Sequence, residues 1–477
     1  MTRLLLVALV LCAASAGLAA EDAAPVGRSL EALRHGSLGQ DLGGRLMGLL
    51  GCLLMVGLAA AVSTRRSRIS WRLVAMGTGL QVVFALVVLK TAAGRLVFDG
   101  ANTAITRLLS FSEAGARFVF GKLVDNAIPV GKPAFSPPEM SPVLSAEFWA
   151  ATGSMMAFRV LPTIIFFSAL TAVLYHLQVL TRIVRAIAWV MQRSMGASGA
   201  ESLSASANIF VGQTEAPLLV RPFLESMTRS ELMCVMTGGF ATVAGGVMAA
   251  FVAMLSPVFP DIAGHLLAAS VMSAPAAMVM AKIMVPEEGE PVTATSSGVA
   301  FTRIDANTVD AAARGTTEGL SLALNVGAML ISFLALLALV NAGVGGVGAW
   351  LGIEGLTLEK IFGWIGAPVA FLLGTPWEDA EVVGSLLGTK TVVNEFVAYG
   401  QLAALLESGS IVHAKSAVIA TYALCGFSNF ASIGIQLGGL SALAPSRRAD
   451  LARLGFRAML AGSLACFQTA AVAAMVL

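Results

Sequence analysis

Two short polar clusters stand inside otherwise apolar stretches of the chain. The run Gln213-Thr214-Glu215 places an amide, a hydroxyl and a carboxylate side by side, and the pair Asn394-Glu395 repeats the amide and carboxylate in the other half. A charged side chain at the centre of a bilayer costs at least about 2.5–3.5 kcal/mol on insertion scales. The two clusters therefore indicate a site for a polar ligand within a membrane.

Composition places the chain among membrane proteins. Of its 477 residues, 57% are hydrophobic and only 12% are charged, whereas soluble proteins carry about 25% charged residues. The mean hydropathy is +0.83. A net charge of +2 gives no electrostatic footprint for a nucleic acid. The five cysteines lie in apolar stretches without metal-ligand or disulfide spacing, so we interpret them as small core residues.

The first twenty residues have the pattern of a secretory signal. Arg3 precedes an apolar core, and small residues at 16–20 offer a cleavage region before Glu21. This order predicts a signal peptide over residues 1–20 and a mature N-terminus outside the cytoplasm. An uncleaved first transmembrane helix is the alternative.

Hydropathy predicts about eight transmembrane helices, each needing about 20 apolar residues. The predicted spans are 44–63, 71–91, 146–177, 231–255, 264–285, 317–341, 410–440 and 452–477. The stretches 200–228 and 361–403 hold the glutamate clusters and are interrupted by polar residues, proline and glycine. Such stretches are typical of re-entrant hairpins, whose irregular backbone is tolerated where protein or a water-filled cavity surrounds it.

Positive charges support one topology. Four arginines, Arg65, Arg66, Arg68 and Arg72, directly follow the first predicted span, which places that end in the cytoplasm. Alternation from there makes the two hairpins enter from opposite faces, each followed by two spans. That order predicts an inverted repeat with its site near the membrane midplane. Residues 92–143 carry arginines on the predicted outer side, but long loops obey the charge rule weakly.

The chain is thus predicted to be an all-α polytopic membrane protein with five parts. After the signal at 1–20 come scaffold spans with an interfacial helix, the first hairpin with two spans, a cytoplasmic loop with a scaffold span and an outer interfacial segment, and the second hairpin with the last two spans. The boundaries of these four parts are 42–199, 200–285, 286–360 and 361–477. The interfacial helix is predicted at 179–199, where arginines alternate with apolar residues.

Several motifs in a fixed order resemble the concentrative nucleoside transporters, a family of ion-coupled nucleoside symporters. The matching stretches are residues 159–167, 212–218, 227–232, 239–245, 394–399 and 425–430. The resemblance extends over about residues 42–477. It implies eight spans and two opposed hairpins per protomer, a homotrimer, and a transport domain that moves against a trimerisation scaffold.

The resemblance also implies roles for particular residues. Those that would face the nucleobase are Gln213, Thr214 and Glu215. Those that would hold the ribose are Glu395, Asn429 and Ser432, and Phe427 would pack against the bound nucleoside. The oxygens that would bind the coupling sodium ion come from Asn208, Val211, Thr242 and Val243.

Elementary chemistry agrees with those roles. A nucleoside is neutral, so the carboxylates serve as strong acceptors, since charge-assisted hydrogen bonds are about twice as strong as neutral ones. One carboxylate, such as Glu395, can accept from the vicinal hydroxyls of ribose. An amide, a hydroxyl and a carboxylate together meet the mixed donors and acceptors of a base edge. Glycines flank Thr242-Val243, which suits a helix that unwinds at an ion site or close helix packing.

The expected function is a sodium-driven symporter that imports nucleosides of the uridine, cytidine and adenosine class across a bacterial inner membrane. A proton-coupled symporter, with Glu215 or Glu395 carrying the proton, is the first alternative. A nucleoside-binding receptor or gate that does not transport is the second. No nucleophile-and-base set or metal-ligand cluster stands out in the sequence, so we expect neither an enzyme nor a cofactor beyond the coupling ion. We expect Lys390 to neutralise one of the acids at 378, 379 and 381.

Overall fold

The computed structural model describes residues 42–125, 127–131, 148–151, 156–294 and 305–477. The predicted signal at 1–20 lies outside these residues. The helices are α3 (Leu42–Ala61), α4 (Trp71–Lys90), α5 (Ala92–Phe120), α6 (Leu161–His176), α7 (Val179–Met195), α8 (Gly199–Ala207), α9 (Arg221–Leu224), α10 (Arg229–Ala241), α11 (Gly245–Leu255), α12 (Ile262–Met284), α13 (Thr308–Trp350), α14 (Leu358–Leu372), α15 (Trp377–Val392), α16 (Glu395–Glu407), α17 (Ala414–Leu424), α18 (Phe430–Leu443) and α19 (Arg448–Val476).

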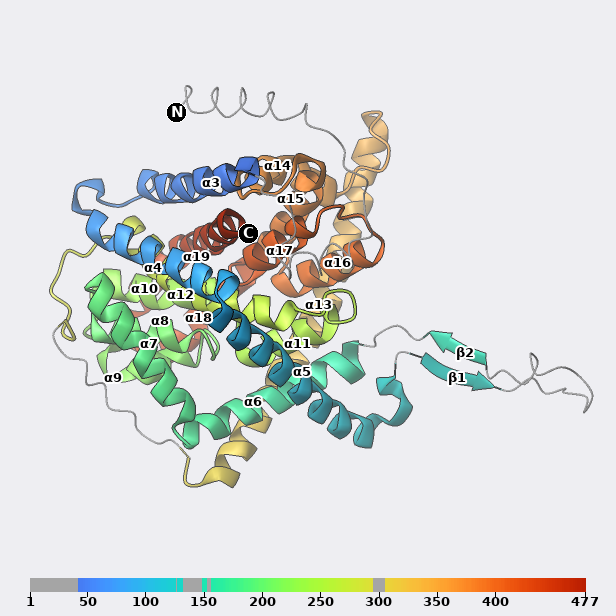
Figure 1. Cartoon of the computed structure of the whole chain (residues 1–477), viewed down its shortest axis with the longest axis horizontal. Coiled ribbons are helices and arrows are strands. Elements are labelled where there is room, and N and C mark those ends of the chain that lie inside the picture. The colour runs from blue at the N-terminus through green and yellow to red at the C-terminus, as the bar shows by residue number, and fades with distance from the viewer. Residues whose placement is uncertain (1–41, 126, 132–147, 152–155, 295–304) are drawn as a thin grey trace, which may run out of the picture.

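The described chain is nearly all helical, with one exception. Strands β1 (Ala127–Gly131) and β2 (Phe148–Ala151) pair antiparallel and project away from the helical body (Figure 1). The sequence places a span over 146–177, but the spanning helix covers Met156–His176, with a π-helical turn at Met156–Val160 that leads into α6. The prediction began too early because the sequence of β2 is itself apolar, so hydropathy does not separate it from the helix that follows. The stretch expected to be a long loop instead holds the 29-residue helix α5.

Helix lengths support the predicted number of spans. Within the described residues, seven helices are long and apolar enough to cross a membrane, and they coincide with seven of the eight predicted spans. The pair α14–α15, bent by 117°, is a broken span or a re-entrant loop and lies in the stretch predicted as the second hairpin. The predicted span at 410–440 is divided, because α17 ends at Leu424 and α18 begins at Phe430. Neither piece reaches the roughly 20 residues that a crossing needs. An apolar run in the sequence does not reveal that its helix is interrupted.

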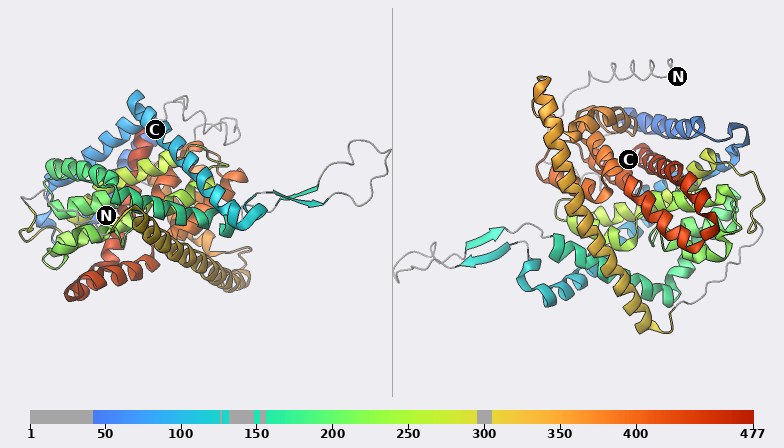
Figure 2. Two further views of the ribbon diagram at one scale, coloured as in Figure 1. Left: turned by 90° about the horizontal axis from the view of Figure 1, so that it is seen from below. Right: turned by 180° about the vertical axis from the view of Figure 1, so that it is seen from behind.

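Burial separates an inner bundle from an outer layer. Helices α10, α11, α12, α17 and α19 are buried along most of their length, as expected for helices that are apolar on all sides. Helices α3, α4 and α6 are largely half-buried or exposed, and α13 exposes most of its apolar residues. The 43-residue α13 runs along one side of the molecule (Figure 2). Its glycines at 315 and 319 face the backbone of α6 closely enough that any Cβ there would collide, which is typical of tight helix packing in membranes.

The bundle contains two similar series of elements. Helices α8 and α9 form a hairpin that precedes a broken helix, α10–α11, and a long helix, α12. Helices α15 and α16 form a second hairpin that precedes the broken helix α17–α18 and the long helix α19. This is the order that the predicted inverted repeat requires.

The two helix breaks lie against each other in the centre of the bundle. The thiol Sγ of Cys466, on α19, lies 3.1 Å from the carbonyl oxygen of Cys425 and 3.6 Å from that of Ala241. Gly426 has φ +155°, and a Cβ there would lie 2.7 Å from the carbonyl oxygen of Phe240. Only glycine fits this contact, because it has no Cβ and tolerates positive φ.

Two capping boxes join the first hairpin to the helix that follows it. Ser198 and Glu201 cap α8, and Thr228 and Glu231 cap α10 in the same way. The boxes are connected, because the hydroxyl of Ser198 donates to Oε1 of Glu231 at 2.6 Å. Each box satisfies backbone N–H groups that a helix start leaves unpaired. Their connection holds the N-termini of α8 and α10 side by side.

A buried lysine completes this cluster. Nζ of Lys282, on α12, lies 2.8 Å from Oε2 of Glu201 and 3.0 Å from Oε2 of Glu287. Lys282 and Glu201 are both buried. Burial alone would raise the pKa of Glu287, but the charge of Lys282 and several hydrogen bonds hold it below its ordinary value. The cluster therefore fixes the base of the first hairpin to α10 and α12.

Replacing Lys282 with methionine should destabilise the protein strongly, because it leaves Glu201 buried without a cation. Removing one partner of a buried ion pair costs about 3–5 kcal/mol. Thermal unfolding in detergent would measure the loss. The double variant Lys282→Met with Glu201→Gln should recover part of it, and a single variant as stable as the native protein would contradict this account.

Candidate functional site

The tip of the first hairpin begins at Asn208, the C-cap of α8. Its backbone N–H continues the helix to the carbonyl of Ser204, and Nδ2 of the side chain donates to the same carbonyl at 3.1 Å. The chain then turns tightly, with the N–H of Gly212 donating to Oε2 of Glu215 at 3.0 Å. Pro217 follows in a short 3₁₀ turn, residues 216–220, where its missing N–H costs nothing.

This tip lies against the break between α10 and α11. The N–H of Gly245 donates to the carbonyl of Phe210 at 3.0 Å. The side chain of Asn208 covers Gly238, where a Cβ would lie 3.0 Å from Nδ2. Thr242, the last residue before the break, donates its hydroxyl to the carbonyl of Gly238 at 2.8 Å. The hairpin tip and the broken helix therefore come together at the residues predicted to bind sodium.

The chemistry of this junction suits a hard cation. Oδ1 of Asn208 is buried and accepts no hydrogen bond from any part of the chain that the structure describes. A buried acceptor without a donor is costly, about 1–3 kcal/mol, and a cation would satisfy it. The helix break supplies further backbone carbonyls. No cluster of three or more His, Cys, Asp or Glu side chains suited to a metal exists among the described residues, so any ion here would rely on amide, hydroxyl and carbonyl oxygens.

The second hairpin turns at Asn394, whose Oδ1 accepts from the N–H of Val397 at 2.9 Å and so caps α16. Glu395 is the first residue of that helix and is buried. Its Oε2 accepts from Nδ2 of Asn429 at 2.7 Å. Asn429 in turn caps α18 through the N–H of Ser432 at 2.9 Å. The structure thus brings Glu395, Asn429 and Ser432 into one hydrogen-bonded group.

An amide pair joins the first hairpin to α18. Nε2 of Gln436 donates to Oε1 of Gln213 at 3.1 Å and to the carbonyl of Met236 at 2.9 Å. The side chain of Thr214 packs against Gly439, also on α18. Gln436 was not among the predicted site residues. Its spacing from Asn429 and Ser432 is i, i+3, i+7, which places all three on one face of a helix, and this pattern was the available signal.

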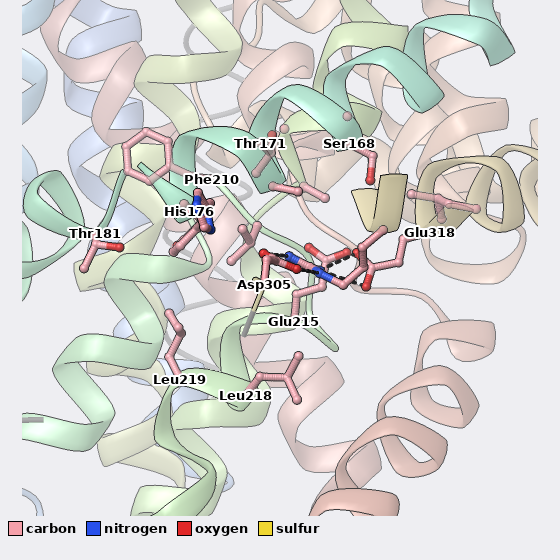
Figure 3. A pocket seen from close by; sticks show the side chains of 18 of the residues that line it. Ser168, Thr171, His176, Thr181, Phe210, Glu215, Leu218, Leu219, Asp305 and Glu318 are labelled. Carbon is pink, nitrogen blue, oxygen red and sulfur yellow. Dashed lines mark hydrogen bonds and ion pairs between the residues drawn. The ribbon is translucent and has the colours of Figure 1, made fainter. Parts of the chain in front are cut away.

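Glu215 faces a separate cavity of about 130 Å³ between the hairpin, α6, α11 and α13 (Figure 3). Polar residues that line it include Thr171, Tyr175, Asp305, Arg314 and Glu318. Arg314 pairs with Asp305 at 2.6 Å and with Glu318 at 2.9 Å. The hydrogen bond from Arg314 holds the pKa of Asp305 below its ordinary value.

The predicted nucleoside residues therefore divide among four places. Gln213 and Thr214 point toward α18, whereas Glu215 points into the cavity beside α13. Glu395, Asn429 and Ser432 form the group at the second hairpin. Phe427 is half-buried in the break before α18, and its carbonyl accepts from the N–H of Asn429 at 2.9 Å.

Three family models match the chain. Residues 50–123 match the N-terminal part, and residues 265–474 the C-terminal part, of the Na⁺-dependent nucleoside transporters. Residues 157–258, which contain the first hairpin and the helix break after it, match a model described as a nucleoside-recognition gate.

Similar proteins span nearly the whole described chain. An uncharacterized transporter, YutK, of Bacillus subtilis is 43% identical over 436 residues, which are 90% of this chain and 99% of that protein. Sodium/nucleoside cotransporter 1 of Rattus norvegicus is 40% identical over 90% of this chain, and the match spans 63% of that longer protein. A solved structure of the transporter CNTnw, in an inward-facing substrate-bound state, is 41% identical with a TM-score of 0.80 and covers 90% of this chain and 97% of its own.

Substituting Gly239 with alanine should damage the contact between α10 and the first hairpin. A Cβ there would lie 2.7 Å from the Cβ of Gln213 and 2.5 Å from Nε2 of Gln436. Overpacking of this kind costs about 1–3 kcal/mol, which thermal unfolding would detect despite the better helix propensity of alanine.

Gly434→Ala is the matched control, because a Cβ at Gly434, on α18, would meet no atom within 4 Å. We expect its stability to equal or slightly exceed that of the native protein. Equal losses in the two variants would show that the close contact at Gly239 is not the cause.

Proposed function

Because this chain belongs to the concentrative nucleoside transporter family, we propose that it is a symporter that imports nucleosides, driven by a sodium gradient. The family consists of transporters and not of enzymes. The buried group of Glu395, Asn429 and Ser432 is the observation that carries the proposal. It offers a carboxylate, an amide and a hydroxyl inside an apolar protein.

The ribose of a nucleoside suits this group. Glu395 still has acceptor capacity beyond its bond from Asn429, and neighbouring ribose hydroxyls are two donors set close together. Charge-assisted hydrogen bonds contribute about 1.5–3 kcal/mol each. A substrate without these hydroxyls would leave the buried carboxylate unpaired, so the group selects for sugars with them.

The nucleobase would meet the amides of the first hairpin. Gln213 and Gln436 form a pair whose amide groups can both donate and accept. We propose that Gln213 and Thr214 contact the base directly. Glu215 lies on the opposite side of the tip, and its contact with the N–H of Gly212 shapes the turn that presents them.

Sodium would bind at Asn208, Val211, Thr242 and Val243. Support comes from the unpartnered Oδ1 of Asn208 and from the close approach of the hairpin tip to the helix break. Sodium would supply positive charge there and hold the hairpin tip against α10. That tip also carries Gln213 and Thr214, so sodium binding would complete the nucleoside site. Binding of sodium and binding of the nucleoside would thereby be coupled.

Transport requires the inner bundle to move relative to the outer layer. We propose that the buried bundle carries the nucleoside and that α13 belongs to the stationary scaffold. The exposed apolar face of α13, with Ile331 75% and Trp350 85% exposed in the single chain, suits contact with lipid and with two further copies in a homotrimer. The protein would lie in the bacterial inner membrane with its mature N-terminus outside.

Two alternatives remain distinguishable by experiment. A proton could replace sodium as the coupling ion, carried by Glu215 or Glu395. A receptor or gate would bind nucleosides without moving them. The fit of Asn208 to a cation favours sodium over a proton, whereas the membership of a transporter family favours transport over binding alone.

Uptake of labelled uridine into proteoliposomes tests the proposal. An inward sodium gradient should drive accumulation, whereas an inward proton gradient alone should not. Glu395→Gln keeps an acceptor oxygen but loses the charge, so uptake should fall about tenfold, the difference between charged and neutral hydrogen bonds.

Accumulation driven only by protons would overturn the sodium mechanism and retain nucleoside transport. Binding of uridine, cytidine or adenosine without accumulation under any gradient would support the receptor instead. Thermal unfolding of each preparation would confirm that it is folded.

A substitution at the proposed ion site should affect sodium before it affects the nucleoside. Asn208→Leu removes the buried Oδ1, so the sodium concentration for half-maximal uptake should rise about tenfold or more, which corresponds to at least ~1.4 kcal/mol. Asn325→Leu, on the exposed surface of α13, is the control. It should leave the sodium concentration for half-maximal uptake unchanged. An unchanged sodium dependence in Asn208→Leu would exclude this site.

A further inference from the structure

Lys390 is a cation enclosed within the inner bundle. It lies in the last turn of α15 and is fully buried. Its Nζ donates to the carbonyl of Ala423 at 2.8 Å and lies 5.9 Å from the ring centroid of Phe467. The sequence led us to expect a partner among the acids at 378–381. Asp379 instead accepts from the N–H groups of Val412 and His413.

The surroundings of Lys390 are those of a cation site made of helix ends. Ala423 is the penultimate residue of α17, directly before the helix break. Lys390 itself sits at the C-terminal end of α15. The C-terminus of a helix carries partial negative charge and free carbonyls, and the ammonium of Lys390 binds one such carbonyl, that of Ala423 at the end of α17. The carboxylate of Glu395 attracts the same ammonium.

The first repeat has the same arrangement without a cation of its own. There Asn208 is the C-cap of α8, and Thr242 is the C-cap of α10 beside the break. The C-terminal end of α8 lies against α10 close to the break, as the side chain of Asn208 beside Gly238 shows. Oδ1 of Asn208 is a buried acceptor that lacks a donor within the described chain, whereas the carbonyl of Ala423 already has one in Lys390.

We propose that Lys390 is a tethered cation that occupies the second-repeat counterpart of the sodium site, and that it limits this transporter to one coupling sodium ion. The inference rests on the proposed sodium mechanism. Half-helix C-termini and unwound carbonyls are the ligands that sodium finds in broken-helix transporters. In the second repeat the ammonium of Lys390 binds such a carbonyl at all times, because it is covalently attached to the chain.

The alternative role for Lys390 is purely structural, a hydrogen bond that ties α15 to α17. The two roles differ when the charge is removed. A structural lysine leaves only a weakened contact after substitution. A tethered cation leaves the carbonyl oxygen of Ala423 without its cation, near the negative charge of Glu395, and a sodium ion can then take the place of the ammonium.

The test is Lys390→Met, which keeps a long side chain without the charge, studied in proteoliposomes with labelled sodium and labelled uridine. The native protein should move about one sodium ion per uridine, and the variant about two. Sodium binding gives a second readout: sodium, against choline, should raise the unfolding temperature of the variant more than that of the native protein, because a second site is filled.

Two further variants separate the possible failures. Lys360→Met, an exposed lysine on α14, is the matched control and should keep the native ratio. The double variant Asn208→Leu with Lys390→Met should retain sodium-dependent stabilisation that Asn208→Leu alone has lost.

A native protein without sodium-driven uptake would refute the proposed function itself. A sodium-driven native protein with an unchanged ratio in Lys390→Met would refute only the tethered cation. Lys390→Gln is measured in parallel. If neither neutral variant yields folded protein at high sodium concentration, the inference is also overturned, because sodium should then have replaced the ammonium.

Discussion

Helices interrupted inside a membrane protein leave carbonyl groups that water cannot reach, and this constraint organises the whole molecule. Each unsatisfied backbone group in such a setting costs several kcal/mol. The structure places its two breaks back to back, with Cys466 beside both and Gly426 permitting their contact. It then covers each break with a hairpin tip. The site is a consequence of this arrangement, because the unwound segments and the tips carry its polar side chains.

Both repeats use the same device at their helix starts. Asn394 and Asn429 cap α16 and α18 with side-chain oxygens, and serine, threonine and glutamate cap α8 and α10. A capped helix start satisfies N–H groups locally. The buried pair of Lys282 and Glu201 then fixes the first hairpin at its base, while its tip depends on softer contacts. A base held by a buried ion pair and a tip held by hydrogen bonds alone would suit the ion response proposed above.

The sequence predicts the spans, both hairpins and the polar clusters, because composition and glutamates in apolar surroundings are local signals. It misses features set by three-dimensional contacts. The direction of Glu215, toward α13 and not toward α18, depends on a tight turn closed by its own carboxylate. Gln436 and Lys390 gain their partners only when distant segments meet. The break within 410–440 was equally hidden, since unwinding leaves the residues as apolar as before.

Helix α13 links this protein to the thickness of its membrane. From Gly319 to Trp350 it carries no charged residue, a length of about 48 Å at 1.5 Å per residue, against a hydrocarbon core of about 30 Å. Such a helix must lie obliquely or deform the surrounding bilayer. In the transport cycle proposed above, an oblique α13 would give the moving bundle an inclined surface, so its displacement would combine lateral and vertical travel. The length of the lipid chains would then influence how easily the bundle moves.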